Sequence, residues 1–269
     1  MEFFQYDFMQ RALAAGLITA FLCPLIGIFV VVRRQSLIGD GLGHIAFAGV
    51  AAGHLAGIYP MAGALLLTLG GAVGIELTRR RHAQYSDMGL AIIFYAGVAM
   101  AIIFSTMTKM PSSGLLSFLF GSIVTVSLQD VGLIAAAGLL VSGILFVWHK
   151  PLLLSSFNED IANVSGIDTG RVNMIFSILT ALVVVVGMTI VGILLVSALM
   201  IVPVAAAHSL RLGFKATLGW AVGFSVLSVT AGLLSSFYLD IAPGGTIVMT
   251  AIILYVLIAV VQTWRENKA

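Results

Sequence analysis

The chain has 269 residues, of which 60% are hydrophobic and only 9% are charged. A soluble domain carries about 25% charged residues to cover its surface, so this composition excludes an ordinary soluble protein and indicates one surrounded mainly by lipid. The formal net charge of +2 is too small to indicate a nucleic-acid partner, and the single cysteine, Cys23, excludes a disulfide within the chain.

Apolar runs of roughly 17–25 residues are long enough to cross a bilayer as helices. Such runs predict an all-α, polytopic protein with eight or nine transmembrane helices, folded as a single transmembrane domain over residues 1–269. The break between the sixth and seventh helices rests only on Gly187, Thr189 and Gly192 inside one apolar stretch. The nine predicted helices cover 10–32, 41–58, 60–78, 88–107, 130–148, 172–190, 192–209, 216–237 and 244–263.

The first apolar run and residues 114–127 need separate assignment. The N-terminus, MEFFQYDFMQR, is acidic and aromatic where a cleavable signal peptide would be basic, so the first apolar run is expected to stay in the membrane as a span. Residues 114–127 are too few to cross comfortably, and they predict a re-entrant or interfacial helix.

Loop charges indicate the orientation of the chain. With the N-terminus outside and the C-terminus inside, 11 of the 13 basic residues lie on the inner side, as the positive-inside rule predicts, and only Arg11 and Lys109 lie outside. If residues 114–127 crossed the membrane, every later loop would change sides and this asymmetry would be lost. The inner residues are Arg33, Arg34, Arg79, Arg80, Arg81, Lys150, Arg171, Arg211, Lys215, Arg265 and Lys268.

The longest hydrophilic inner segment lies near residues 151–171. It is too small to fold alone but large enough for one or two short helices on the inner surface. The sequence contains no G-x-x-x-x-G-K-[ST] phosphate-binding loop, so any use of ATP is assigned to another polypeptide.

Asp40 and His44 are the main candidate site, because ionisable residues at membrane depth are costly and usually functional. They are four residues apart and so lie one above the other on one helix face. Carboxylate oxygen and imidazole nitrogen are suitable ligands for Zn²⁺ or Mn²⁺, and a two-fold dimer would bring together two of each. The plainer alternatives are that Asp40 caps the helix start and that His44 hydrogen-bonds a carbonyl.

Two other ionisable residues are candidates for the same pathway. His54 lies about 15 Å beyond His44 on the same helix, too far to share one ion but suitable as an outer station. Asp240 precedes an outer turn and is either a receiving carboxylate or a simple turn residue. On the opposite helix face, Gly49, Gly53 and Gly57 form overlapping G-x-x-x-G units that favour close helix packing.

Several segments resemble the permeases of the ABC-3 family of zinc and manganese ATP-binding-cassette importers, nearly from end to end. LIGDGLGHIAFAGVAAG is similar to the second-span motif of that family, and Asp40 and His44 fall on its acidic and histidine positions. LLVSALMIVPVAAA resembles a Ser/Pro-containing inner span. Supporting similarity comes from SDMGLAIIFYAGVAMAI, LFGSIVTVSLQD and APGGTIVM.

The resemblance implies a multi-pass permease of a bacterial plasma membrane that is not itself an enzyme. It implies a homodimer, two cytoplasmic ATPase subunits, an extracytoplasmic metal-binding protein and no permanently bound cofactor, with Zn²⁺ or Mn²⁺ as the transported ion. It assigns the metal to Asp40 and His44. It likens the inner segment to the helix that docks on the ATPase, with contacts at Phe157, Glu159, Ala162 and Gly166, although Asn158 and Asp160 depart from the commoner pattern.

Other functions remain alternatives on the sequence alone. A proton- or sodium-coupled secondary transporter would use Asp40 and His44 as a relay, but no second copy of that segment is found in the later half. The permease of a siderophore or vitamin B12 importer would have a similar architecture. An intramembrane metalloprotease needs an H-E-x-x-H-like helix, which the sequence does not contain. Zinc is favoured over manganese by the general affinity order.

Overall fold

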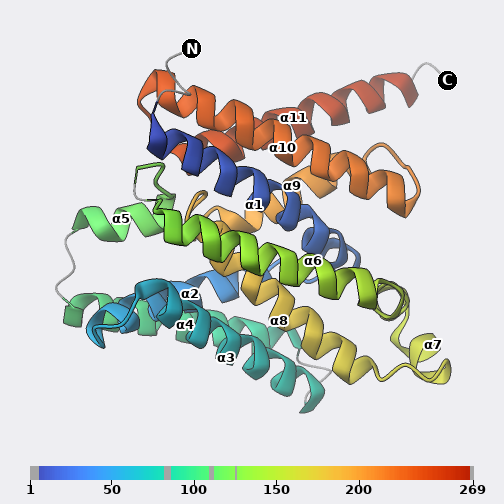
Figure 1. Ribbon diagram of the computed structural model, residues 1–269. Helices are drawn as coiled ribbons and strands as arrows, with labels where there is room; N and C mark the ends of the chain where they lie inside the picture. The colour runs from blue at the N-terminus through green and yellow to red at the C-terminus, as the bar shows by residue number, and fades with distance from the viewer. Residues whose placement is uncertain (1–5, 82–85, 109–111, 125, 267–269) are drawn as a thin grey trace.

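The computed structural model describes residues 6–81, 86–108, 112–124 and 126–266 (Figure 1). Across these residues every regular element is an α-helix, which confirms the all-α prediction. The helices are α1 (Asp7–Val32), α2 (Ile38–Leu55), α3 (Pro60–Arg81), α4 (Ser86–Thr108), α5 (Ser112–Phe120), α6 (Leu128–Phe157), α7 (Glu159–Val164), α8 (Thr169–Met188), α9 (Val196–His208), α10 (Phe214–Leu239) and α11 (Pro243–Glu266).

The long helices run between two ends of the molecule (Figure 1). One end holds the N-terminus and α5, and the other holds the C-terminus and α7; we refer to them as the α5 end and the α7 end. Among the described residues, seven helices are long and apolar enough to cross a membrane: α1, α3, α4, α6, α8, α10 and α11. The nine residues of α5 extend only about 14 Å against a bilayer core of about 30 Å. The structure therefore agrees with the prediction that this segment does not cross.

α2 and α9 are not among those seven helices. α2 has 18 residues, of which 13 are buried, because it packs against α3, α4, α8 and α9. It also carries three ionisable residues, Asp40, His44 and His54. α9 has 13 residues and is apolar. Both helices are therefore interior elements that the surrounding helices cover.

The predicted break between the sixth and seventh helices is confirmed. α8 ends at Met188, α9 begins at Val196, and the backbone between them is not helical. Unpaired backbone groups are costly inside a membrane, and here the amides of Ile193 and Leu194 donate to the carbonyls of Phe118 and Leu119 at 3.0 and 3.3 Å. The helix begins later than the predicted residue 192 because these residues pair with α5 instead.

α6 is longer than predicted. Its 30 residues continue to Phe157, so residues 151–157, expected in the inner loop, belong to this helix. The helix continues through Pro151 because the following turn is packed: Leu152 is fully buried and Ser155 is nearly so. Only α7 and the residues around it remain of the predicted inner loop.

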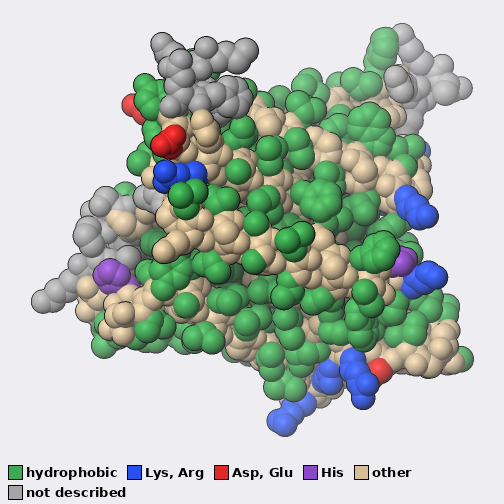
Figure 2. All heavy atoms as spheres, in the orientation of Figure 1, with side chains coloured by type: hydrophobic (Ala, Val, Ile, Leu, Met, Phe, Trp, Pro, Cys, Tyr) green, Lys and Arg blue, Asp and Glu red, His purple; other side chains and the backbone are tan. Residues whose placement is uncertain are grey.

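Basic side chains are concentrated at one end of the molecule (Figure 2). In that view most Lys and Arg side chains gather at the α7 end, and acidic side chains are visible near the N-terminus. Between the ends the visible surface is mainly hydrophobic. This distribution is the one expected of a chain surrounded by lipid along the length of its helices.

Candidate metal site and coupling segment

Glycine contacts with α3 fix one side of α2. A Cβ atom added to Gly49 would lie 2.5 Å from the Gly63 carbonyl oxygen, and one added to Gly53 would lie 3.2 Å from the Cα of Pro60. The helices therefore touch through their backbones, as the G-x-x-x-G spacing predicts. Gly57 does not take part: α2 ends at Leu55, Gly57 has a left-handed φ of 68°, and no atom lies within 4 Å of its added Cβ.

Other close contacts fix the first half of α2, which carries the candidate ligands. A Cβ on Gly97 of α4 would lie 3.0 Å from the Ile45 amide nitrogen and 3.3 Å from the His44 carbonyl carbon. A Cβ on Gly39 would lie 2.6 Å from the Ser197 Oγ atom of α9. Because α3, α4 and α9 all approach so closely, α2 has little freedom to shift without moving its neighbours.

Asp40 and His44 are both half-buried on α2, one turn apart. The His44 ring packs edge-on against Phe94 of α4, with 4.8 Å between ring centroids. The described residues contain no group of three or more His, Cys, Asp or Glu side chains that could hold a metal ion. One protomer therefore offers two neighbouring donors, a carboxylate and an imidazole, but not a complete coordination shell.

His54 and Asp240 are both exposed at the α5 end of the molecule. His54 occupies the last turn of α2, ten residues beyond His44, and does not belong to the Asp40 and His44 pair. Asp240 is the residue that caps the C-terminus of α10, with a left-handed φ of 54° and its backbone N–H donating to the Ser236 carbonyl. Their part in an ion pathway stays a prediction.

The four residues predicted to contact an ATPase lie together around α7 but face different ways. Phe157 is 66% exposed, whereas Ala162 is fully buried. The Glu159 carboxylate accepts hydrogen bonds from Arg79 and Asn173, each at 3.1 Å. Gly166 follows α7 with a left-handed φ of 80°, a conformation that suits glycine. Their contact with an ATPase stays a prediction.

Two exposed apolar residues of α7 were not identified from the sequence. Ile161 is 56% exposed and Val164 is 91% exposed, and they stand three residues apart on one helix face. Phe157, Ile161 and Val164 are all exposed apolar residues of the segment around α7, and we call these three residues the α7 surface. The spacing of Ile161 and Val164 was the available signal: residues 151–171 were predicted to hold one or two short helices, which α7 confirms, but only Phe157, Glu159, Ala162 and Gly166 were named as contacts.

These features define a class of protein. Among the described residues, seven helices are long and apolar enough to cross a membrane, and three of them, α3, α4 and α8, pack with α9 around α2. α2 carries a half-buried carboxylate and imidazole, and the short helix α7 lies at the basic end. That arrangement is the one expected of the membrane-embedded permease of a transporter.

Comparison with known proteins identifies the family. The model of the ABC 3 transport family matches residues 5–262, so the chain belongs to that family. A "probable metal transport system membrane protein" of Treponema pallidum is 37% identical to it, with 98% of this chain and 99% of the relative covered. The present chain is therefore a multi-pass protein of a bacterial cell membrane. It is the permease subunit of an ATP-binding-cassette transporter, in which a separate subunit hydrolyses ATP.

Further relatives carry names for two different metals. The manganese transport system membrane protein MntC of Halalkalibacterium halodurans is 31% identical, with 100% of this chain and 94% of the relative covered. The zinc uptake system membrane protein ZnuB of Haemophilus influenzae is 29% identical, with 94% and 97% covered. A chain in the solved structure of PsaBC from Streptococcus pneumoniae in complex with Fab is 26% identical in sequence and superposes with a TM-score of 0.86. The match covers 98% of this chain and 96% of the PsaBC chain. The metal-importer permease fold is thereby confirmed.

Proposed function

We propose that the chain is the permease of an ATP-driven importer of divalent metal ions, and that it prefers Zn²⁺ to Mn²⁺. The observation that carries this proposal is the Asp40 and His44 pair, half-buried on an interior helix whose position three neighbouring helices fix. A carboxylate and an imidazole replace part of the hydration shell of a borderline divalent cation. The names of the relatives support a metal as the transported substrate.

The metal site is proposed to form between two copies of the chain. The pair in one protomer supplies two donors, and the described residues offer no third His, Cys, Asp or Glu beside it. A two-fold homodimer that brought the α2 faces together would supply two carboxylates and two imidazoles. Four donors of this kind match the coordination number that Zn²⁺ prefers.

The basic α7 end is proposed to face the cytoplasm, with the N-terminus outside and the C-terminus inside. The concentration of Lys and Arg at that end supports this orientation. His54 and Asp240, exposed at the opposite end, would then be open to an extracytoplasmic metal-binding protein. We assign them to the reception of the ion, about 15 Å from the His44 level in the case of His54.

The α7 surface is proposed to dock on the ATPase subunits, one for each permease. Phe157, Ile161 and Val164 offer an exposed apolar surface in which the partner would bury side chains. The buried Ala162 and the bonds of Glu159 to Arg79 and Asn173 set the position of α7, and Gly166 forms the left-handed turn that follows it. Closure of the ATPase dimer would then move α7 and rock the helices between two access states.

Zinc is preferred on the chemistry of the donors. The affinity of imidazole and carboxylate sites rises from Mn²⁺ to Zn²⁺ in the Irving–Williams order. Manganese is accommodated better by sites with more oxygen ligands, and the proposed shell contains equal numbers of nitrogen and oxygen donors. The two metals compete at the same site under this proposal.

The test is metal uptake by proteoliposomes that contain the permease together with its ATPase subunits. The parent complex should import Zn²⁺ in an ATP-dependent manner and prefer it to Mn²⁺. Asp40→Ala and His44→Ala should each abolish uptake, whereas the matched control His149→Ala, an exposed histidine at the far end of α6, should not. Uptake that survives both α2 substitutions would overturn the site assignment, and faster uptake of Mn²⁺ would overturn the preference.

A further inference from the structure

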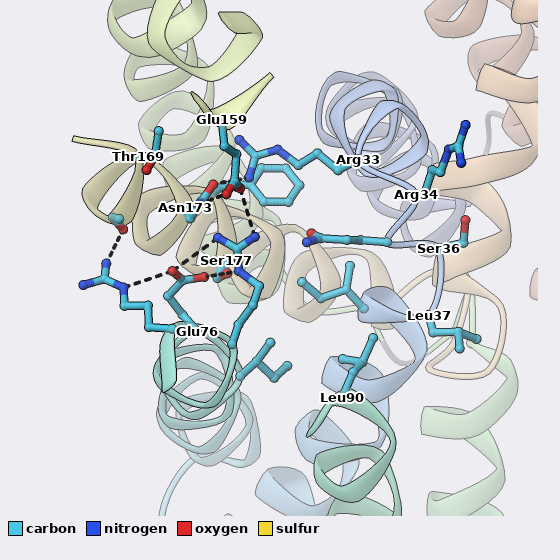
Figure 3. Close-up of a pocket in the computed structure, with 17 residues that line it drawn as sticks. Arg33, Arg34, Ser36, Leu37, Glu76, Leu90, Glu159, Thr169, Asn173 and Ser177 are labelled. Atoms are coloured by element: carbon cyan, nitrogen blue, oxygen red, sulfur yellow. Dashed lines mark hydrogen bonds and ion pairs between the residues drawn. The ribbon is translucent and has the colours of Figure 1, made fainter. Parts of the chain in front are cut away.

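A cavity of about 690 Å³, lined by both polar and apolar side chains, opens at the α7 end, between the α1–α2 turn, the last turns of α3 and the start of α8 (Figure 3). A connected set of side chains crosses it. We call Arg33, Glu76, Arg79, Glu159 and Asn173 the polar clamp. None of these residues is among the candidate metal ligands, and four of them have no role in the proposed function so far.

The first part of the polar clamp is the end of α3. The Glu76 side chain is only 2% exposed, and a carboxylate buried to that degree requires opposite charge. Arg79 Nε and Arg80 Nε supply it, each at 3.1 Å from a Glu76 oxygen. Arg79 then uses Nη1 to reach Glu159 of α7, also at 3.1 Å. One guanidinium therefore joins a carboxylate of α3 to a carboxylate of α7.

The second part runs from α7 to the end of α1. Asn173 of α8 donates its Nδ2 to Glu159 at 3.1 Å and accepts Arg33 Nη1 on its Oδ1 at 2.6 Å. Arg33 also donates to Ser155 and Ser156 of α6, each at 2.8 Å. Its guanidinium lies over the Phe176 ring, 4.4 Å from the centroid. Four helices and α7 thus meet in one network.

Arg33 connects this network to the candidate metal site. It caps the C-terminus of α1, and the tight turn after it includes Arg34 with a left-handed φ of 56°. α2 starts at Ile38, so Asp40 lies only seven residues after Arg33. Burial, aided by the charge of Arg79, lowers the pKa of Arg33 to about 10, which leaves it protonated at neutral pH. A charged, oriented side chain therefore stands between α7 and the turn that leads to Asp40.

We propose that the polar clamp transmits movement of α7 to the α1–α2 turn, which makes Glu159, Asn173 and Arg33 positioning residues for transport. The proposal rests on the proposed function. When α7 moves, Glu159 moves with it and displaces Asn173 and Arg79 through their hydrogen bonds. Asn173 in turn displaces Arg33, which lies just before the start of α2. Glu159 is the member of the polar clamp whose loss should disturb the fold least, because its side chain is 48% exposed. Its removal breaks the bonds between α7 and the rest of the polar clamp, while the bonds among the buried residues remain.

The test measures zinc imported per ATP hydrolysed, in proteoliposomes of the permease with its ATPase subunits. Glu159→Ala, which removes the oxygen that accepts from both Arg79 and Asn173, should lower this ratio about fivefold, the lower end of measured coupling between two sites, while the ATPase stays bound. The matched control is Asp160→Ala, which makes the same truncation at the next, exposed position of α7 and should leave the ratio unchanged. Asn173→Ala should act like Glu159→Ala, and the double variant should be no worse than either, because both break one path.

The outcomes separate this inference from the proposed function. A parent complex that imports no zinc would overturn both. A parent that imports zinc, with Glu159→Ala as well coupled as the parent, would overturn the polar clamp alone. Equal loss in Glu159→Ala and Asp160→Ala would also overturn it, because the effect would then come from the loss of any carboxylate on α7. Additive losses in the double variant would show that Glu159 and Asn173 act separately, against the proposal.

Discussion

The close approach of α2 and α3 gives a quantitative prediction for Gly49→Ala. The added Cβ would lie 2.5 Å from the Gly63 carbonyl oxygen and 2.6 Å from the Ala64 Cα. Ordinary contacts begin at about 3.4 Å, so the two backbones must separate by almost 1 Å. Backbone atoms cannot rotate away as side chains do, and we expect the free energy of unfolding to fall by about 1–3 kcal/mol, as for other overpacked sites.

Gly70→Ala is the matched control for this prediction. Gly70 lies on α3 like Gly63, but nothing lies within 4 Å of its added Cβ. Alanine there should be neutral or stabilise the protein by up to about 1 kcal/mol, since it removes backbone freedom of the unfolded chain. The assay is reversible unfolding in mixed micelles, followed by circular dichroism. Equal stability of Gly49→Ala and Gly70→Ala would refute the backbone contact on which the position of α2 depends.

Two other predictions concern the two ends of the molecule. Burial and the hydrogen bond to Asp130 raise the pKa of Tyr59 from 10.0 to about 12. Because the pKa is higher in the folded protein, the stabilisation from this tyrosine is complete below about pH 10 and is lost as the pH rises through about 12. The difference in 295 nm absorbance between the parent and Tyr59→Phe should titrate near pH 12, and titration near 10 would contradict the structure. At the other end, the double variant Phe157→Ser/Val164→Glu should prevent the ATPase from co-purifying with the permease, whereas Asp160→Asn should not. Retention of the ATPase by the double variant would exclude the α7 surface as its docking site.

Much of the fold follows from local sequence patterns. Length and hydropathy of single runs predict the long helices, and those properties do not depend on distant partners. The failure of residues 114–127 to cross was predicted from loop charges and agrees with the short α5. The contact through Gly49 and Gly53 was predicted from spacing alone, since close helix packing needs small residues at that interval.

The parts that were not predicted depend on contacts between distant residues. α6 continues through Pro151 because Leu152 is buried against the core, whereas a proline by itself favours a helix end. Gly57 was assigned to the glycine face, but α2 ends before it. Arg33 was counted only as an inner positive charge, and its bond to Asn173 joins residues 140 positions apart.

Part of the candidate site could likewise be predicted from the sequence, and part could not. Asp40 and His44 were identified from sequence because an i, i+4 pair on one helix face needs no tertiary information. Whether they line a path depends on a second copy of the chain. The bonds that Arg79 of α3 and Asn173 of α8 donate to Glu159 come from residues 80 and 14 positions away, so the sequence grouped Glu159 with Phe157 as a contact of the ATPase.

X-ray absorption spectroscopy of the zinc-loaded permease–ATPase complex tests the central claim most directly. The account predicts one zinc per two permease chains, with two imidazole nitrogens at about 2.0–2.1 Å, oxygen donors completing the shell and no sulfur. His44→Ala should remove the imidazole signal. A zinc with a single imidazole ligand, or one zinc for every permease chain, would contradict a metal site shared between two copies of Asp40 and His44.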